Sequence, residues 1–424
     1  MQVELPDTLA HDPLAREAAA VIGRCVHCGF CNATCPTYQL RGDELDGPRG
    51  RLYLMKQLLE GKPAGEITRL HLDRCLTCRA CETTCPSGVE YGRAIEASRE
   101  LLELRLPRPA MGRWRRVLLR MFLGSRAFSP ALAIGRVLRP WLPLALRRRI
   151  PRRTAAGLWP VVTHARKVLV PGGCVQPALF PRTDAALARI LARLGVSVIA
   201  VAGCCGSLRQ HLDDPAGALA GVRANVDAWW PHVERGIESI MMTASACGLQ
   251  VKDYGRLLGD DPAYAGRAAR IAALARDPAE YLGGFSAELH RLCALQHAHV
   301  VFHAPCTLQH GQRLGGSVES LLARLGAKPL PVADAQLCCG SAGAYSILQS
   351  AISSQLRDRK LRALTASRPT EILSANVGCI AHLAAGTDLP VRHWLEWLDE
   401  VMTRPGVPSS TSPSSTMKRP LTST

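Results

Sequence analysis

The sequence predicts a multi-domain α+β protein, with a mainly helical N-terminal region followed by two copies of an α/β unit. Three observations lead to this fold class. The chain has 424 residues, enough for two to three domains of ~150 residues each. Cysteines form two identical runs near the N-terminus, and further cysteines recur in two matching halves of the remaining chain. Hydrophobic residues make up 47% and charged residues 21%, as in ordinary globular domains.

Residues 1–100 contain two cysteine runs of the pattern Cys-x2-Cys-x2-Cys-x3-Cys-Pro, and the second run lies 50 residues after the first. This is the ligand pattern of bacterial-type ferredoxins that hold two [4Fe–4S] clusters. In such proteins the fourth cysteine of each run binds the other cluster. The prediction is therefore one cluster on Cys25, Cys28, Cys31 and Cys85, and a second on Cys35, Cys75, Cys78 and Cys81.

Zinc and disulfides are the alternatives for these two runs. Zinc usually pairs two Cys-x2-Cys units across a long loop, which leaves the third and fourth cysteine of each run without a role. The 17 cysteines are a smaller share of the chain than the ~8–10% of disulfide scaffolds. Their ordered clusters favour metal ligation in a reducing compartment, so we expect a cytoplasmic protein. Two clusters form a path for single electrons, and we assign no catalytic residue.

Residues 101–167 are predicted to form a basic amphipathic linker. From Leu104 to Thr183 the chain has no Asp or Glu but 17 Arg and Lys, which equals the net charge of +17 for the whole chain. Apolar residues such as Trp114 and Leu118 alternate with these arginines, as in helices that lie on an anionic membrane surface. An acidic patch on a partner subunit is the alternative. Without a recognised motif or stacking platform we expect no nucleic acid, and no stretch resembles a membrane-spanning helix.

Residues 168–290 and 291–402 are predicted to be duplicated domains, because their sequence motifs recur at offsets of 131 to 134 residues. In both copies a helical pattern ends in LARLG, at 191–195 and 322–326, whose glycine favours a helix C-terminus. In each copy, apolar runs alternate with helical patterns, which predicts a parallel sheet covered by helices. The cysteines follow the strand ends, where open α/β sheets bind their ligands. We therefore expect the four cysteines of each copy to converge. The two sets are Cys174, Cys204, Cys205 and Cys247 in the first copy, and Cys306, Cys338, Cys339 and Cys379 in the second.

Three interpretations remain open for these two sets of cysteines. They are a further iron–sulfur centre in one or both copies, a structural zinc or redox dithiol, and a vestigial site in at least one copy. Cys293 lies outside the pattern and is expected to be a buried thiol. His303, His310 and His382 flank the second set, and we expect them to be hydrogen-bonded packing residues. Residues 403–424 are rich in Ser, Thr and Pro and are expected to be disordered.

The chain resembles the iron–sulfur subunits of glycolate oxidase, also called glycolate dehydrogenase, as far as about Val401. The cysteine runs are common to many oxidoreductases, so the resemblance rests mainly on other segments. These are ANVDAWWP (224–231), VKDYG (251–255), HAPCTLQHGQRL (303–314), LCCGSAGAY (337–345), SANVGC (374–379) and PVRHW (390–394). The resemblance implies a two-[4Fe–4S] ferredoxin-type domain followed by two cysteine-rich (CCG) domains. In wider relatives a CCG domain often ends in Cys-x-x-Cys, whereas Gln250 and His382 stand at that last position here.

The resemblance also implies a function. Glycolate, and in some cases D-lactate, would be oxidised on FAD in partner subunits, and electrons would pass through this chain toward a membrane quinone. The chain would then lie in the cytoplasm, at the inner face of the cell membrane. It has no Gly-rich dinucleotide fingerprint, so FAD is expected only in the partner. The alternative is an iron–sulfur subunit of another flavin dehydrogenase, for lactate or sn-glycerol 3-phosphate.

Overall fold

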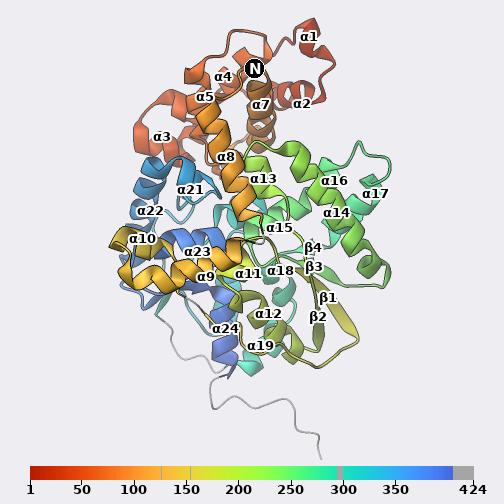
Figure 1. Ribbon diagram of the computed structural model, residues 1–424, viewed down its shortest axis with the longest axis vertical. Helices are drawn as coiled ribbons and strands as arrows, with labels where there is room; N and C mark the ends of the chain where they lie inside the picture. The colour runs from red at the N-terminus through yellow and green to blue at the C-terminus, as the bar shows by residue number, and fades with distance from the viewer. Residues whose placement is uncertain (126, 153, 294–298, 404–424) are drawn as a thin grey trace, which may run out of the picture.

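The computed structural model describes residues 1–125, 127–152, 154–293 and 299–403. A helical N-terminal part is followed by two α/β parts, which confirms the predicted fold class (Figure 1). The N-terminal helices lie at the top of Figure 1 and the two α/β parts lie below them. The predicted domain boundaries remain predictions, and the predicted disordered tail lies outside the described residues beyond Thr403.

The N-terminal part packs its helices around a core of buried aliphatic side chains. Helix α2 shows how the sequence sets one of these elements: Asp12 caps its first turn by accepting from the Leu14 and Ala15 amides at 2.9 and 3.1 Å. Its residues Ala18 and Ile22 are fully buried against the core. The elements are α1 (Asp7–Ala10), α2 (Pro13–Gly23), η1 (Phe30–Thr34), α3 (Pro36–Arg41), η2 (Glu44–Asp46), α4 (Pro48–Leu59), α5 (Glu66–Asp73), α6 (Ala80–Thr84) and α7 (Tyr91–Arg105).

The first α/β part is a four-stranded parallel sheet in the order β2-β1-β3-β4. Its strands are β1 (Arg166–Pro171), β2 (Val196–Val201), β3 (Ser239–Met241) and β4 (Ala275–Arg276). The helices between and after them are α11 (Gln176–Leu179), α12 (Arg182–Arg193), α13 (Ser207–His211), α14 (Pro215–Glu234), α15 (Ser245–Lys252), α16 (Tyr254–Leu257), α17 (Ala265–Leu274), α18 (Pro278–Gly283) and α19 (Ser286–Leu292).

The second α/β part repeats this topology with one strand reduced. Its sheet β5-β6-β7 is parallel, and Leu330 adds a single bridge to Val301 where the first copy has β2. Pro329 and Pro331 flank Leu330 and lack amide hydrogens, so the ladder cannot extend. The elements are β5 (Val300–His303), η4 (Thr307–Gly311), α20 (Ser317–Arg324), α21 (Tyr345–Leu348), α22 (Ser350–Thr365), β6 (Glu371–Ser374), α23 (Val377–Ala384), β7 (Val391–His393) and α24 (Trp394–Thr403).

The predicted strands and helices of the two copies are confirmed, with one omission. The LARLG segments end α12 and α20, and their glycines Gly195 and Gly326 take φ angles of 74° and 96°, as a helix C-terminus favours. The sequence reasoning missed the last strand of each sheet, β4 and β7. These strands have two and three residues, too short for a visible alternation of apolar and polar residues.

The two copies share one hydrophobic core. Helix α12 of the first copy packs against α24 of the second, and α18 of the first packs against α20 of the second. The fully buried side chains of this core include Leu187 and Ile190 from one copy and Trp394 and Leu395 from the other. The copies are therefore held face to face, with the strand ends of both directed toward one region.

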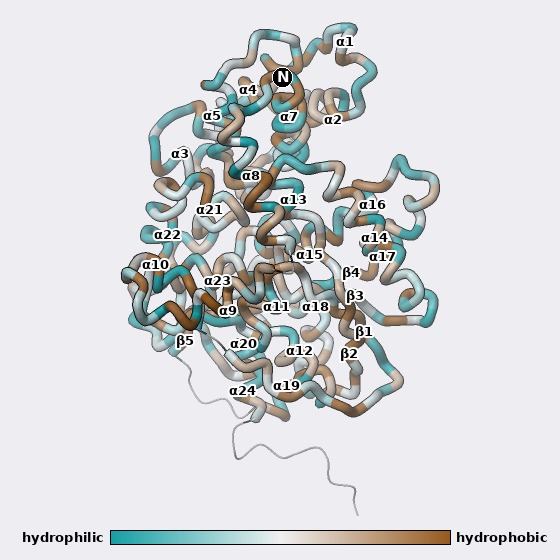
Figure 2. The backbone as a smooth tube through the Cα atoms, in the orientation of Figure 1, coloured by the Kyte–Doolittle hydropathy of each residue, from teal (hydrophilic) through white to brown (hydrophobic). Residues whose placement is uncertain are grey.

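The basic linker forms α8 (Ala110–Leu123), α9 (Phe128–Leu138), η3 (Arg139–Trp141) and α10 (Leu144–Arg149) on the outside of the molecule. In Figures 1 and 2 these helices lie on the face toward the viewer and carry several hydrophobic stretches. Among the described residues, no single helix is long and apolar enough to cross a membrane. The pair formed by α8 and residues 128–141 is together long and apolar enough to cross a membrane, but it is bent by 90°.

Candidate functional site

Both N-terminal cysteine runs fold in the same way. His27 and Thr77, which are 50 residues apart, have positive φ angles of 61° and 51°. This turn directs the amide of each toward the sulfur of the first cysteine in its run, Cys25 or Cys75, at 3.4 Å in both cases. Hydrogen bonds to cysteine sulfur tune the reduction potential of a bound cluster. The repeated sequence therefore produces a repeated sulfur environment.

A second positive-φ position follows the second cysteine of each run. Gly29 takes φ 84° before η1, and Arg79 takes φ 59° before α6. Glycine adopts this conformation without steric cost, whereas arginine there is unusual and indicates a constrained turn. These turns bring the third cysteine of each run back toward the first two.

The eight cysteines line two neighbouring cavities. One is lined by Cys25, Cys28, Cys31 and Cys85, and also by Cys81. The other is lined by Cys35, Cys75, Cys78 and Cys81. Cys81, Pro48 and Tyr91 line both cavities, so the two lie next to each other.

The arrangement of these sulfurs fits a cluster better than a single ion. Ligands of one zinc ion gather closely around it, at Zn–S distances of ~2.3 Å. Among the described residues, no three of the eight N-terminal cysteines have their sulfurs within 4.8 Å of one another. Burial raises the pKa of Cys31 to about 11 and the pKa values of Cys78 and Cys81 well above the ordinary value. Such thiols ionise when bound iron supplies positive charge.

A buried ionic network supports the second cavity. Asp46 is fully buried and contacts Arg41 at 2.8 Å, Arg74 at 3.0 Å and His71 at 2.9 Å. Arg51, also buried, lines the cavity and donates to the His71 carbonyl at 2.7 Å. Burial lowers the pKa of the Arg51 guanidinium. Electrostatic attraction to Cys75, Tyr91, Cys35 and Asp46 outweighs burial, so the pKa lies above its ordinary value. Arg51 therefore stays charged beside the cysteines.

The four cysteines of the first α/β copy converge, as expected. The thiols of Cys174 and Cys205 hydrogen-bond to Cys204, and Cys205 also hydrogen-bonds to Cys247. The bonds that Cys204 accepts lower its pKa, while the same bonds raise those of the two donors. These residues follow β1, β2 and β3, at the C-terminal edge of the sheet.

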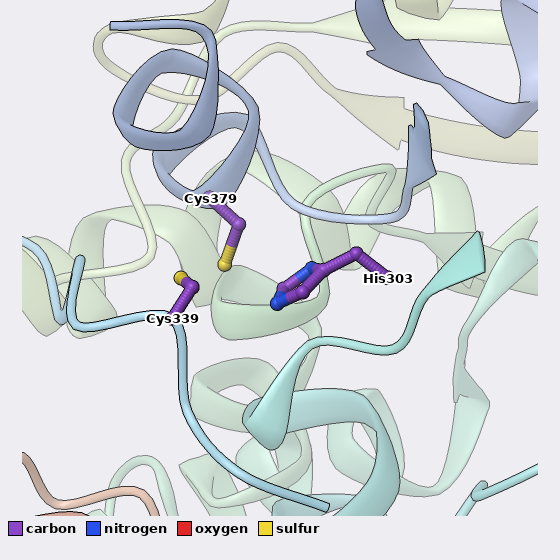
Figure 3. A group of neighbouring side chains, drawn as sticks. All are labelled: His303, Cys339 and Cys379. Atoms are coloured by element: carbon purple, nitrogen blue, oxygen red, sulfur yellow. The ribbon is translucent and has the colours of Figure 1, made fainter. Parts of the chain in front are cut away.

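In the second copy the cysteines contact one another in the same order, and a histidine imidazole lies beside them. Cys306 donates to Cys338 at 3.7 Å, and hydrogen bonds also link Cys338 to Cys339 and Cys339 to Cys379. His303, at the end of β5, points toward Cys339 and Cys379 (Figure 3). One donor atom from each of these three residues lies within 4.8 Å of the others.

The glycine after each cysteine pair is required by the backbone. Gly206 and Gly340 have φ angles of 92° and 89°, which other residues rarely adopt. A Cβ atom on Gly340 would also lie 2.7 Å from the Ser353 carbonyl oxygen. Glycine at these positions therefore lets both adjacent cysteines face one site.

Several residues that hold these turns were not predicted. The Asn225 amide donates to the Cys204 carbonyl at 2.8 Å, and the Tyr254 hydroxyl donates to the Cys205 carbonyl at 3.2 Å. Both residues lie in segments that carry the family resemblance, and this resemblance was the one sign in the sequence that they matter. In the second copy, buried Lys360 donates to the carbonyls of Asp334 and Ala335 at 2.9 Å.

The second N-terminal cavity adjoins the second α/β copy. Cys78 and Cys306 both pack against a buried cluster that contains Leu76, Cys338 and Tyr345. The Tyr345 hydroxyl donates to the Arg74 carbonyl at 3.0 Å. Across the same interface, His310 Nδ1 lies 2.9 Å from Thr83 Oγ1.

A larger, open cavity lies where the N-terminal part, α8 and both α/β parts meet. Cys75 lines it, together with Arg99 and His211. Arg116 of α8 lines its outer side. A small molecule in this cavity would therefore contact Cys75, one of the cysteines that line the second N-terminal cavity.

The remaining predicted residues are placed as follows. All 17 cysteines are free thiols, which removes the disulfide alternative. Cys293 is buried in the core shared by the two copies, as expected. His382 hydrogen-bonds with Ser353, in agreement with a packing role.

Comparison with known proteins agrees with this architecture. A family model described as a 4Fe-4S dicluster domain matches residues 21–89, and one described as a cysteine-rich domain matches residues 168–252 and 300–384. The chain is 47% identical over 408 residues to the glycolate oxidase iron-sulfur subunit of Escherichia coli (strain K12), covering 95% of this chain and 100% of that protein.

Two further relatives are more distant. The probable glycolate oxidase iron-sulfur subunit of Bacillus subtilis (strain 168) is 29% identical over 402 residues, or 86% of this chain and 88% of that protein. Lactate utilization protein A of Shouchella clausii (strain KSM-K16) is 22% identical over 232 residues, or 52% of this chain and 93% of that protein. With its 4Fe-4S dicluster domain and two cysteine-rich domains, the chain belongs to the family of glycolate oxidase iron–sulfur subunits.

Proposed function

We propose that this chain is the electron-transfer subunit of a flavin-dependent glycolate dehydrogenase complex. Glycolate is oxidised to glyoxylate on FAD in partner subunits, and D-lactate is proposed as a further substrate of the same site. The observation that carries the proposal is the 47% identity to a glycolate oxidase iron-sulfur subunit over its full length. When bound, [4Fe–4S] clusters supply one-electron transfer.

Two groups of cysteines are proposed as the ligands. Cys25, Cys28, Cys31 and Cys85 hold the first cluster, and Cys35, Cys75, Cys78 and Cys81 hold the second. The two cavities support the crossed assignment, because Cys85 lines the cavity of the first three cysteines and Cys35 lines that of Cys75, Cys78 and Cys81; Cys81 lies between the two cavities and lines both. Cys28 is exposed, so the first cavity lies near solvent, and this side is proposed as the one that faces the flavin subunit.

The second cavity is proposed as the exit side of the path. The open cavity lined by Cys75 and by Arg116 of α8 is the proposed route by which a quinone headgroup would approach. Helix α8 exposes Met111, Trp114 and Leu118 beside Arg113, which makes no ion pair with any described residue. Such a surface suits peripheral attachment to the anionic inner face of the cell membrane.

Part of the positive charge of the linker is used within the chain. Arg108 pairs with Asp213 at 2.8 Å, Arg116 pairs with the same carboxylate at 2.6 Å, and Arg148 pairs with Asp388 at 3.0 Å. These arginines attach the linker to both α/β parts. The membrane proposal therefore rests on the exposed apolar residues of α8 and on the neighbouring Arg113.

Purification of the intact complex from its own cells tests the proposal. We expect the chain to carry flavin-containing subunits with it, and the complex to reduce a dye or quinone with glycolate. Cys28→Ser should abolish this turnover while Cys293→Ala, at a buried thiol outside the pattern, leaves it intact. A complex that oxidises only lactate or sn-glycerol 3-phosphate would instead support the alternative dehydrogenases. Full turnover with Cys28→Ser would contradict the electron-transfer role.

A further inference from the structure

The open cavity beside Cys75 has walls that suit a neutral molecule with apolar faces. It is bordered by the N-terminal part, α8, α13 and α21, and in Figure 1 helix α8 lies between α13 and α21. Leu76, Leu104, Pro215 and Leu348 form its apolar walls. Among the described residues that line it, five carry a carboxyl group and two carry a guanidinium group. An anionic hydroxy acid would be repelled by this excess of carboxyl groups, whereas a neutral ring would not.

Most polar side chains of this cavity already bond to other parts of the protein. Arg99 donates to the Cys75 carbonyl at 2.8 Å. The Tyr345 hydroxyl donates to a backbone carbonyl at 3.0 Å, and the Gln210 amide donates to the Glu96 carboxylate at 3.3 Å. These groups fix the shape of the cavity, and their hydrogen atoms are not available to an occupant.

Two neutral side chains in the cavity have no hydrogen-bond partner among the described residues. They are His211, in the last turn of α13, and Gln349, which precedes α22 without capping it. Neither belongs to the enclosed polar groups that lack a partner, so both face open space. Burial, with the nearby charges of Arg99 and Arg79, lowers the pKa of His211 to about 4. The cavity therefore offers an uncharged imidazole N–H from the first α/β copy and an amide NH₂ from the second.

The place of the cavity restricts what its occupant can do. Cys75 lines both this cavity and the second N-terminal cavity, so an occupant lies next to a proposed cluster. A [4Fe–4S] cluster passes electrons singly, and the occupant must be able to accept them singly. Arg116 of α8 also lines the cavity, and the same helix exposes Trp114 and Leu118 on the proposed membrane surface. A neutral ring that is carried in lipid and accepts single electrons is a quinone.

From these observations we infer that the cavity binds a quinone between the two α/β copies, with His211 donating to one quinone carbonyl and Gln349 to the other. The inference rests on the proposed electron-transfer function, because the electrons must first reach the cluster at Cys75. The quinone takes up two electrons, one after the other, and two protons from water in the open cavity, and it leaves as quinol. Oxidation of one glycolate to glyoxylate releases the same number of electrons and protons, so the overall reaction balances.

Binding of a fluorescent quinone analogue to the purified complex tests this inference without turnover. A hydroxyquinoline N-oxide is titrated into the oxidised complex, and the quenching of its fluorescence gives Kd. His211→Leu has a side chain of similar size without an N–H, and it should raise Kd about 10-fold because one quinone carbonyl loses its donor. Gln349→Leu should have an effect of the same size. His232→Leu is the matched control, since His232 lies in α14 of the same copy and does not line the cavity.

Two more variants separate binding from a structural role. His211→Gln keeps an N–H donor, so its Kd should stay within ~3-fold of the wild-type value. Leu104→Trp places a larger side chain at the wall, at a position that is 71% exposed and tolerates the change. It should weaken binding as well, and it keeps the test informative even if His211→Leu does not fold.

The possible failures of this inference and of the proposed function can be told apart. The inference is wrong if the wild-type complex does not bind the analogue, or if His211→Leu and Leu104→Trp bind it as tightly as the wild type. It is also wrong if His232→Leu weakens binding as much as His211→Leu does. A wild-type complex that fails to reduce a dye with glycolate would contradict the proposed function, whatever its affinity for the analogue.

Discussion

The charge of Arg51 is expected to set the reduction potential of the second N-terminal cluster. Arg51 lines the cavity formed by Cys35, Cys75, Cys78 and Cys81, and its side chain is 1% exposed. A reduced cluster carries one more negative charge than an oxidised one, so a fixed cation nearby favours reduction. Arg51→Met removes that cation and keeps most of the side-chain volume.

The size of the effect follows from the position of Arg51 at the cavity wall. At a separation of ~7 Å and an effective dielectric constant of ~20, one unit charge changes the energy of an added electron by about 2.4 kcal/mol. For a one-electron couple this energy corresponds to about 100 mV. Arg41 and Arg74 remain on Asp46 and partly compensate, so we expect the potential to fall by ~50–100 mV.

An EPR-monitored redox titration of the whole complex measures this shift. Arg41→Met is the control, because Arg41 contacts the same Asp46 carboxylate but is 40% exposed and does not line the cavity. Its removal should change the potential by less than ~20 mV, since solvent screens its charge. An unchanged potential in Arg51→Met, or equal shifts in both variants, would refute the electrostatic argument.

Three further predictions concern ligation, pH dependence and the linker. Cys85→Ser should alter the EPR signal of the first cluster and Cys35→Ser that of the second; the reverse assignment would contradict the crossed pairing. Burial raises the pKa of Asp277 to about 7, so its carboxylate destabilises the fold increasingly as the pH rises from about 4 to 7. Asp277→Asn keeps the cap on α18, where Oδ1 accepts from the Ala279 amide at 2.9 Å. The melting temperature should rise at pH 8, by ~2–4 °C per kcal/mol, and stay unchanged at pH 4; equal effects at both values would count against the titration of Asp277. Trp114→Ser with Leu118→Ser should weaken co-sedimentation with anionic vesicles at least ~10-fold, because each side chain contributes ~2 kcal/mol when buried in lipid, and unchanged binding would rule out α8 as the docking surface.

Much of the fold could be predicted because the chain repeats itself. The two cysteine runs, 50 residues apart, predicted two equivalent turns, and His27 and Thr77 adopt the same left-handed conformation. The LARLG segments likewise predicted two equivalent helix ends, at Gly195 and Gly326. Short local patterns of this kind are read directly from the sequence, since the chemistry and the spacing lie within a few residues.

The features that could not be predicted depend on distant residues. His303 reaches Cys339 and Cys379 only because β5 pairs with β6 and the Cys-Cys-Gly turn returns to the same sheet edge. A lone histidine beside a cysteine gave no sign of that geometry, and the sequence analysis expected a packing role. The role of Arg51 could not be predicted either, because its position beside the cysteines follows from the packing of α4 in the N-terminal core. Strand β7 was missed because its three residues carry no periodic pattern.

The central claim is that electrons from the oxidised hydroxy acid pass through the cysteine-bound clusters of this chain. Rapid freeze-quench EPR of the purified complex, mixed anaerobically with glycolate, measures this passage directly. The account predicts that the two N-terminal clusters are reduced at least as fast as the complex turns over with its acceptor. Clusters that stay oxidised while the complex turns over at its normal rate would contradict it.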